Sequence, residues 1–461
     1  MNTSENRQKR SIARSWLWVG LVVLLIVGGI LWSQMSTVRL AAKSYVFGYP
    51  LVMTDLTRNS FIHTVAPANR LVNMAQFPEA DFQVFVRPNL DTLYTQAWLD
   101  MDAGPWVFEV PASSRYLVMQ FLDAWTNVFA SVGTRTTGDK GGRFLLAGPD
   151  WHGQVPEGMT LLRSSTRINW LLGRVQTNGK SDYPAVHAIQ AGISLRSLDD
   201  WQQGTVIEAL PFQLPKQLPP SPLFEMRKLG PRAFFGQLSM LMEDNPAAAT
   251  DVAAVAELEQ LGVRVGEGEP RWNWLQEHAV AVGMWLAERE MNAALESPKV
   301  LVNGWNKAPK HMAAFGQDYG LRAVVAMYGF GANLAAEASY FNAKVDARGE
   351  VLQSGQRYRL HFAAGELPPA QAFWSLTAYD MNGYLIPNPL HRYALGDRDK
   401  LVYNPDGSLD LLLQSEAPGE QQLSNWLPTP RSGPFTLTVR IYLPTQRLLD
   451  GQWQMPGIER F

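Results

Sequence analysis

Hydrophobic and polar positions follow different periods in different parts of this chain, and these periods predict its elements. A run of seventeen uncharged residues at 16–32 predicts one long apolar helix. Short apolar runs separated by turn residues between 84 and 174 predict a β-rich segment. A helical period returns between 245 and 336, and strict alternation at 436–443 predicts that the chain ends in a β domain.

These patterns divide the 461 residues into five parts and predict a mainly β protein with helices. Two β domains, of which the C-terminal one is jelly-roll-like, are joined by a helical segment and preceded by one transmembrane helix. The predicted parts are a cytoplasmic tail at 1–15, an anchor at 16–33, a β-rich domain at 41–208, a proline-rich connector with helices at 209–336, and the jelly-roll-like domain at 337–461.

The apolar run at 16–32 has the features of a membrane anchor. As a helix it would be ~26 Å long, close to the ~30 Å hydrocarbon core of a bilayer. Trp16, Trp18 and Trp32 lie at its two ends, where interfacial aromatic residues are common. Basic residues precede it, so we expect a single-pass inner-membrane protein with its bulk on the periplasmic side. A cleaved signal peptide and a buried helix are the alternatives.

Local signals predict where several helices bend, begin or end. Gly48 and Pro50 predict a kink, or two short helices, after the apolar run. Asn245 followed by proline predicts an N-cap, with Gly262 ending that helix. Residues 275–296 and 318–336 predict two more helices.

Two turn signals predict hairpins in the C-terminal domain. Asn-Gly at 382–383 follows the apolar run 373–379, and both residues tolerate positive φ. The segment NPDG at 404–407 predicts a turn that pairs a strand at 401–403 with another at 409–413.

Composition narrows the range of functions. The formal net charge is −2 and no basic patch follows the N-terminal tail, so nucleic acid is not an expected partner. Cysteine is absent, which excludes disulfides, thiol catalysis and Cys-ligated metals. The seven histidines show no metal-binding spacing, and we expect no metal site and no cofactor. The sixteen tryptophans indicate buried core residues or an aromatic-lined cleft.

Several motifs resemble a known pair of domains. The segments PNLDTLY at 88–94, DAWTN at 123–127 and GTRTTG at 133–138 resemble the domain of unknown function numbered 1254. The segments at 373–379, 387–393, 403–407 and 425–428 resemble its usual partner, numbered 1214. The resemblance implies two β-rich domains joined by helices, and it brings no assigned reaction.

A dense set of polar loop residues forms the main candidate site. Asp91 and Asp123 are the catalytic candidates, as a carboxyl acid–base pair, and Arg135 or Arg174 would clamp an anionic substrate. The alternative is structural, with an Asx-turn at 89–91 and an Asp–Arg ion pair. The candidate binding residues are Asn89, Thr92, Tyr94, Asn127, Thr134, Arg135, Thr136 and Arg174.

A second polar group follows the Asn-Gly turn and favours a structural role. Asparagine and proline in this group suit a hydrogen-bonded corner better than chemistry. Its members are Asn388, Arg392, Tyr393, Asp397, Asn425 and Trp426.

Three functions remain open from sequence alone. The first is an envelope protein that binds a small molecule or polymer between its two β domains. The second is a hydrolase or lyase that uses Asp91 or Asp123. The third is a structural module that assembles with itself, as a homo-oligomer, or with an envelope partner.

Overall fold

The protein is described here from a computed structural model. The structure describes the backbone of residues 3–82, 86–214, 218–296 and 301–461. Side chains are described over the same ranges, except for residues 3–28, 30–33 and 296.

Within these residues the protein is mainly β with helices, and its sheets form two β domains. The larger sheet of the first domain has six strands in the order β10-β1-β2-β8-β4-β5, and a second sheet has the order β7-β6-β3-β9. The six strands, in sheet order, are Leu210–Pro211, Val72–Asn73, Thr92–Asp100, Ile168–Gln176, Leu117–Asp123 and Val128–Gly133. The other four are Thr160–Arg163, Gly142–Ala147, Trp106–Val110 and Ser194–Ser197.

Alternation along β2 explains which face of the six-stranded sheet is buried in its own domain. Leu93, Ala97 and Leu99 point into a core shared with the four-stranded sheet. Tyr94 and Trp98 therefore point to the opposite side, because successive side chains of a strand alternate. We call this opposite side the outer face of the six-stranded sheet.

The C-terminal domain is a sandwich of two sheets. One has the order β11-β12-β18-β14-β15 and the other β17-β16-β13-β19. The first five strands are Trp305–Lys307, Ala338–Ala343, Phe435–Pro444, Ala370–Asp380 and Ala394–Gly396. The other four are Trp426–Pro428, Leu409–Gln414, Tyr358–Phe362 and Ile458–Arg460. Leu376, Val439, Leu360 and Leu411, from four strands of both sheets, meet in its core.

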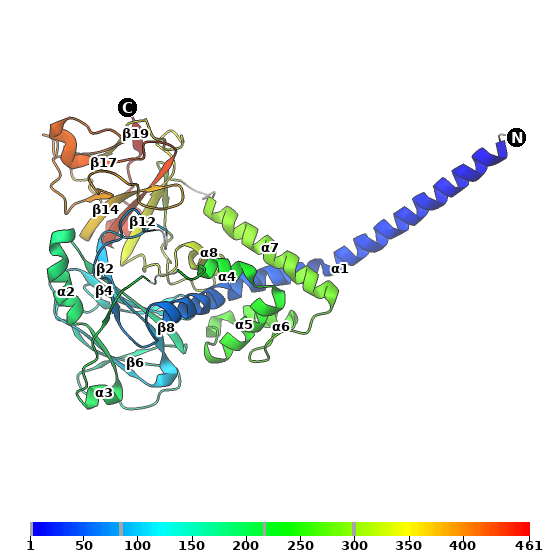
Figure 1. Cartoon of the computed structure of the whole chain (residues 1–461), viewed down its shortest axis with the longest axis horizontal. Coiled ribbons are helices and arrows are strands. Elements are labelled where there is room, and N and C mark those ends of the chain that lie inside the picture. The colour runs from blue at the N-terminus through cyan, green and yellow to red at the C-terminus, as the bar shows by residue number, and fades with distance from the viewer. Residues whose placement is uncertain (1–2, 83–85, 215–217, 297–300) are drawn as a thin grey trace.

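The helices gather on one side of the β domains, around α1 (Figure 1). α1 spans Thr3–Thr64, and its part inside the globular body packs against five helices. These are α4 (Pro222–Lys228), α5 (Pro231–Asp244), α6 (Val252–Gln260), α7 (Trp274–Glu296) and α8 (Tyr319–Tyr328). Three other helices lie outside this group: α2 (Tyr183–Ala191), α3 (Leu198–Gln202) and α9 (Gln446–Leu449).

The prediction of two short helices around Gly48 is wrong, because α1 continues as one helix through Pro50. A Cβ at Gly48 would lie 2.3 Å from a methyl group of Leu238, so glycine here lets α5 approach α1 closely. Buried residues such as Phe47 and Leu51 hold the helix on both sides of the proline. Packing of this face outweighs the hydrogen bond lost at proline.

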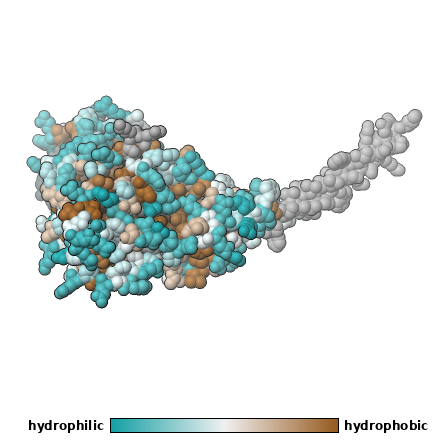
Figure 2. Space-filling view, turned by 60° about the horizontal axis from the view of Figure 1, so that its bottom comes forward, coloured by the Kyte–Doolittle hydropathy of each residue, from teal (hydrophilic) through white to brown (hydrophobic). Residues whose placement is uncertain are grey.

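Figure 1 shows α1 leaving the globular body as a single helix. In the part of the chain that the structure describes, no helix is both long and apolar enough to cross a membrane. The predicted anchor at 16–33 lies outside the described side chains, Gly29 excepted. On the view in Figure 2 the globular body is largely hydrophilic, with separate hydrophobic groups.

Other local predictions were partly correct. The strand before the Asn-Gly turn is present as β14. Directly after the turn Leu385 forms a single bridge with Tyr379, and the strand that pairs with β14 comes later, as β15. Residues 401–403 form no strand, because Asn425 takes the backbone hydrogen bonds of Val402. The strand predicted at 409–413 is β16, which pairs instead with β13 and β17.

The predicted helices differ from those observed mainly at their ends. Asn245 caps the end of α5 rather than starting a helix, and α6 begins only at Val252. The helix predicted at 275–296 is present as α7. The one predicted at 318–336 ends at Tyr328 as α8, and the chain then crosses the outer face of the six-stranded sheet.

Candidate functional site

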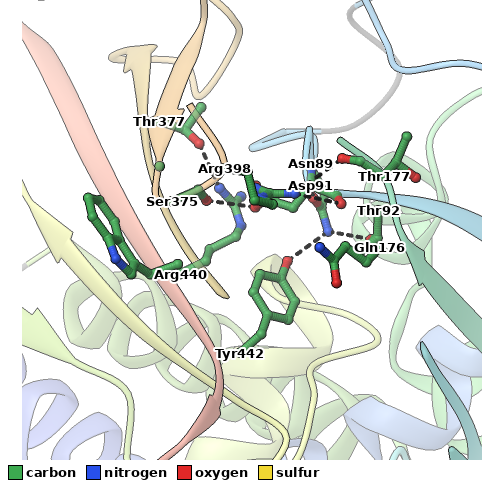
Figure 3. A network of polar contacts seen from close by, with 12 residues as sticks. Asn89, Asp91, Thr92, Gln176, Thr177, Ser375, Thr377, Arg398, Arg440 and Tyr442 are labelled. Carbon is green, nitrogen blue, oxygen red and sulfur yellow. Dashed lines mark hydrogen bonds and ion pairs between the residues drawn. The ribbon is translucent and has the colours of Figure 1, made fainter. Parts of the chain in front are cut away.

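The polar residues that open β2 lie where the two β domains meet. Asp91 is 1% exposed, and Ser375 Oγ of β14 donates a hydrogen bond of 2.6 Å to its Oδ2. Arg398 forms an ion pair with Asp91 Oδ1 and also donates to the carbonyl oxygens of Asp91 and Thr177. Both carboxylate oxygens of Asp91 therefore have partners from the C-terminal domain (Figure 3).

Asn89 combines the predicted Asx-turn with a contact between the domains. Its Oδ1 accepts a 2.6 Å hydrogen bond from the backbone N–H of Asp91. Its Nδ2 lies within hydrogen-bond distance of Thr92 Oγ1, Tyr94 Oη and, at 3.0 Å, Tyr442 Oη of β18. The structural alternative from sequence analysis, a turn plus an ion pair, thus describes the geometry around Asp91.

A second cation, which is itself buried, fixes the same interface. Arg440 of β18 donates to Thr377 Oγ1, Tyr379 Oη and the carbonyl oxygen of Arg87. Burial opposes its charge, but the neighbouring Tyr379, Tyr442 and Asp91 raise the pKa of Arg440 above its ordinary value.

Arg174 lies on the outer face of the six-stranded sheet, where it is paired with Tyr94 of β2 on one side and with Val118 of β4 on the other. Its Nη1 donates to Asn333 Oδ1 and its Nη2 to the Gly331 carbonyl oxygen, each at 2.9 Å. The guanidinium carbon lies 5.1 Å from the centre of the Tyr94 ring. Asn333 Nδ2 in turn donates 2.6 Å to Tyr340 Oη. Arg174 thereby holds the segment that follows α8 against the sheet.

The loop at 133–138 serves mainly as a connector. Thr134 bonds the backbone of Leu117, and Thr136 Oγ1 donates to the Ser131 carbonyl oxygen. Arg135 Nε donates 2.6 Å to Glu337, a buried carboxyl group that also accepts from Tyr116 Oη. Burial raises the pKa of Glu337, while Arg135 and Tyr116 oppose that shift. The loop therefore fixes the start of β12.

Asp123 does not form an acid–base pair with Asp91. Thr92, next to Asp91, pairs with Gln176 of β8, whereas Asp123 pairs with Asn169. Seven positions along a strand separate the two sites by roughly 24 Å. The error arose because motif order along the chain does not show at which end of a strand each residue lies.

Asp123 instead organises its own turn. It accepts hydrogen bonds from the backbone N–H groups of Trp125 and Asn127 and from the Asn127 side chain. Burial raises the pKa of Asp123 to about 6, against the effect of these hydrogen bonds.

Three polar atoms on the outer face are buried without any hydrogen-bond partner: Gln120 Oε1, Ser131 Oγ and Trp170 Nε1. Gln120 and Ser131 are direct partners across β4 and β5. Trp170 is opposite Leu122 and thus diagonal to Gln120, at about 7–8 Å between Cα atoms. The three atoms supply an acceptor, a hydroxyl and a donor on one patch of sheet.

Sequence analysis missed these three residues. The one available signal was Gln120, the lone uncharged polar residue inside an otherwise apolar strand. Nothing in the sequence connects it to Ser131 or Trp170, because only strand pairing places them together.

The second predicted group is a hydrogen-bonded corner. Asn388 bonds the backbone of Ile386, Leu390 and Arg392, and Asn425 bonds that of Val402 and Asp410. Arg392 donates to the carbonyl oxygens of Leu423 and Trp426. Tyr393 Oη bonds Glu79 of the first domain, and Asp397 accepts from the backbone N–H of Trp374.

Within the described ranges, no group of three or more His, Asp or Glu side chains could hold a metal ion.

Comparison with known proteins identifies domains without a described activity. Residues 68–197 match a family model described as "Protein of unknown function (DUF1254)", and residues 337–446 match "Protein of unknown function (DUF1214)". No protein with curated annotation matches the chain.

Two solved structures are similar in different degrees. The crystal structure of the VPA0106 protein from Vibrio parahaemolyticus is 24% identical with a TM-score of 0.68, covering 92% of this chain and all of that one. At this identity the likeness concerns the fold alone. An uncharacterised protein from Burkholderia cenocepacia is 13% identical, with a TM-score of 0.43, and covers 95% of this chain and 98% of its own.

Proposed function

Since this chain belongs to the proteins that carry a DUF1254 domain followed by a DUF1214 domain, we propose its function from its own residues. We propose that it is a binding protein of the bacterial envelope, tethered to the inner membrane by residues 16–33. It would hold a small, neutral, hydroxyl-bearing molecule, or a segment of such a polymer, on the outer face of the six-stranded sheet.

The observation that carries the proposal is the group of unpartnered atoms on Gln120, Ser131 and Trp170. A buried polar group without a partner costs about 1–3 kcal/mol, and such groups are rare in folded proteins. A ligand with several hydroxyl groups would satisfy an acceptor, a donor and a hydroxyl together. The neutral side chains of all three residues favour an uncharged ligand.

The aromatic surroundings support the same class of ligand. Trp170 is only partly buried, and its ring forms a cluster with those of Trp98 and Phe330, whose centroids are 5.0 and 5.2 Å away. The chain after α8 lies over this patch, since Gln120 Nε2 donates to the carbonyl oxygens of Gly331 and Ala332. A bound molecule would therefore be enclosed between the sheet and this segment.

Catalysis by the two candidate carboxylates receives less support. Both oxygens of Asp91 are engaged by Arg398 and Ser375, and Asp123 bonds its own turn. The tether is supported by the apolar run at 16–32 and by the basic residues before it.

The test is ligand binding by thermal shift and calorimetry, using neutral oligosaccharides and polyols, with small aromatic acids for comparison. A stabilising neutral ligand should bind Ser131→Ala about 5–15-fold more weakly, which corresponds to ~1–1.5 kcal/mol for one hydrogen bond. Trp170→Phe, which keeps a ring but removes the N–H donor, should have a similar effect.

The matched control is Ser44→Ala. Ser44 Oγ is also buried without a partner, but it lies on α1. This variant should bind as the parent does. Stabilisation by none of the neutral compounds, or an unchanged affinity in Ser131→Ala, would contradict the proposal.

A further inference from the structure

An exposed stripe runs along α7, the helix that crosses α1. We call the residues Trp274, His278, Val282, Trp285 and Arg289 the α7 stripe. They recur at intervals of three or four positions and therefore share one side of the helix. Trp274 is 71% exposed, Trp285 58% and Val282 48%. Two exposed tryptophans on one helix face are unusual for a surface that meets only water.

The opposite side of α7 packs on α1. A Cβ at Gly283 would lie 2.5 Å from the Val38 carbonyl oxygen and 2.7 Å from the Ala41 side chain, so the two helices cross closely at that point. Val280 and Met291 are buried in the same helical core. The stripe therefore has a fixed position relative to α1.

This crossing lies close to the proposed anchor. Residue 38 follows residue 33 by five positions of one continuous helix, a distance of about 8 Å. The interfacial layer beyond the hydrocarbon core is itself about 5–8 Å deep on each side of a bilayer. In Figure 1, the end of α7 that follows α6 lies at the side of the body from which α1 leaves. With residues 16–33 in a membrane, α7 would lie at its surface.

From these distances we propose that the α7 stripe is a second membrane contact, which inserts its tryptophans into the lipid interface around the anchor. The inference rests on the proposed tether.

The chemistry of the stripe fits a lipid interface. Tryptophan concentrates at the boundary between headgroups and acyl chains, where an apolar ring can meet a polar layer. Arg289 lies over the Trp285 ring, with its guanidinium carbon 5.6 Å from the ring centre. The stripe therefore holds a cation next to the ring, where it can contact the phosphate groups of lipids. On α1, the exposed Met35 and Arg39 repeat this pairing of an apolar and a cationic residue beside the crossing. The anchor would span the bilayer and the α7 stripe would lie on its surface. These two contacts together would fix the tilt of the globular body relative to the membrane.

The absence of cysteine makes the test direct. Val282→Cys places a single environment-sensitive fluorophore in the middle of the stripe and leaves both tryptophans in place. The full-length protein is reconstituted in vesicles of phosphatidylethanolamine and phosphatidylglycerol that contain nitroxide-labelled lipid. We expect strong quenching at position 282, and several-fold weaker quenching at Val206→Cys, a site 79% exposed on the first β domain.

Two further variants separate the inference from the tether. Leu24→Cys reports whether the anchor is inserted. Quenching at position 24 without quenching at position 282 contradicts the α7 contact but agrees with the tether. No quenching at position 24 contradicts both the tether and the α7 contact. Replacing Trp274 and Trp285 with serine in the Val282→Cys protein should reduce quenching to the level of position 206. Emission that shifts without lipid quenching, and that self-quenches between labelled copies, would mean that a second copy covers the stripe, which overturns the proposal.

Discussion

Asp91 and Ser375 are 284 positions apart in the chain, yet Ser375 Oγ donates a 2.6 Å hydrogen bond to Asp91 Oδ2. This bond joins the residue just before β2 of the DUF1254 domain to β14 of the DUF1214 domain. Together with the ion pair to Arg398, this hydrogen bond shows that Asp91, a catalytic candidate from sequence, connects the two domains.

Removing the cation of this link should destabilise the protein strongly. Arg398→Met leaves the Asp91 carboxylate buried and uncompensated, which typically costs about 3–5 kcal/mol. The urea unfolding midpoint measures the effect. The control is Arg359→Met, because Arg359 pairs with Glu459 on the surface and such a pair is worth under about 1 kcal/mol. Equal losses in the two variants would contradict the structural role of Asp91.

Titration of Asp123 should leave a signature in the pH dependence of stability. Its pKa is raised from 3.8 to about 6 in the folded protein, so the folded state binds the proton more tightly than the unfolded state. The resulting stabilisation is fully present below pH 4 and is lost as the pH rises through 6. Asp123→Asn cannot titrate, so the parent should lose stability relative to this variant between pH 4 and 7, as measured by melting temperature.

Asp406 provides the control with the opposite sign. Hydrogen bonds from Ser408 hold the pKa of Asp406 below its ordinary value. The parent should therefore gain stability relative to Asp406→Asn as the pH rises. If the stability of the parent changed in the same direction relative to Asp123→Asn and to Asp406→Asn, neither carboxyl group would be the cause of the pH dependence.

Gly331 should be intolerant of any side chain. It has φ of +81°, and a Cβ would lie 2.7 Å from Leu172 and 2.8 Å from Trp170. Gly331→Ala should therefore cost more than the ~1–2 kcal/mol of left-handed strain alone, and it should weaken ligand binding by lifting the segment off the sheet. The control is Gly349→Ala, because Gly349 has φ of +84° and no atom within 4 Å of the added Cβ. Chemical denaturation of this variant measures the backbone strain alone, and the additional loss in Gly331→Ala measures the steric clash.

The contact between α1 and α5 predicts a rescue. Gly48→Ala places a methyl group against Leu238 and should lower the melting temperature, since overpacking typically costs ~1–3 kcal/mol. Leu238→Ala alone should also destabilise, by leaving a cavity. Combined, the two changes should cost less than the sum of the single losses, because the new methyl group fills part of that cavity. Strict additivity would mean that the two residues do not contact each other.

Much of the fold could be predicted from local pattern. Alternation at 436–443 predicted β18, and the period of residues 275–296 predicted α7. The motifs at 88–94 and 373–379 indicated the right domain family. These features can be predicted from the sequence because each depends on residues only a few positions apart in the chain.

The site could be predicted only in part. Asn89, Asp91, Thr92, Tyr94 and Arg174 do gather where the domains meet. The role of Asp91 could not be inferred, because its partners Ser375 and Arg398 come from the other end of the chain. The unpartnered atoms of Gln120, Ser131 and Trp170 also depend on which strands are neighbours.

The sequence by itself determined the periods of the elements, the two β domains and the apolar run before them, because backbone geometry and hydrophobic burial act through nearby residues. Only the tertiary structure decided that Asp91 and Asp123 lie at opposite ends of one sheet, that α1 continues through Pro50, and that the α7 stripe lies beside the start of the body. Each of these depends on pairing between distant segments, whose free energy is absent from any local stretch of sequence.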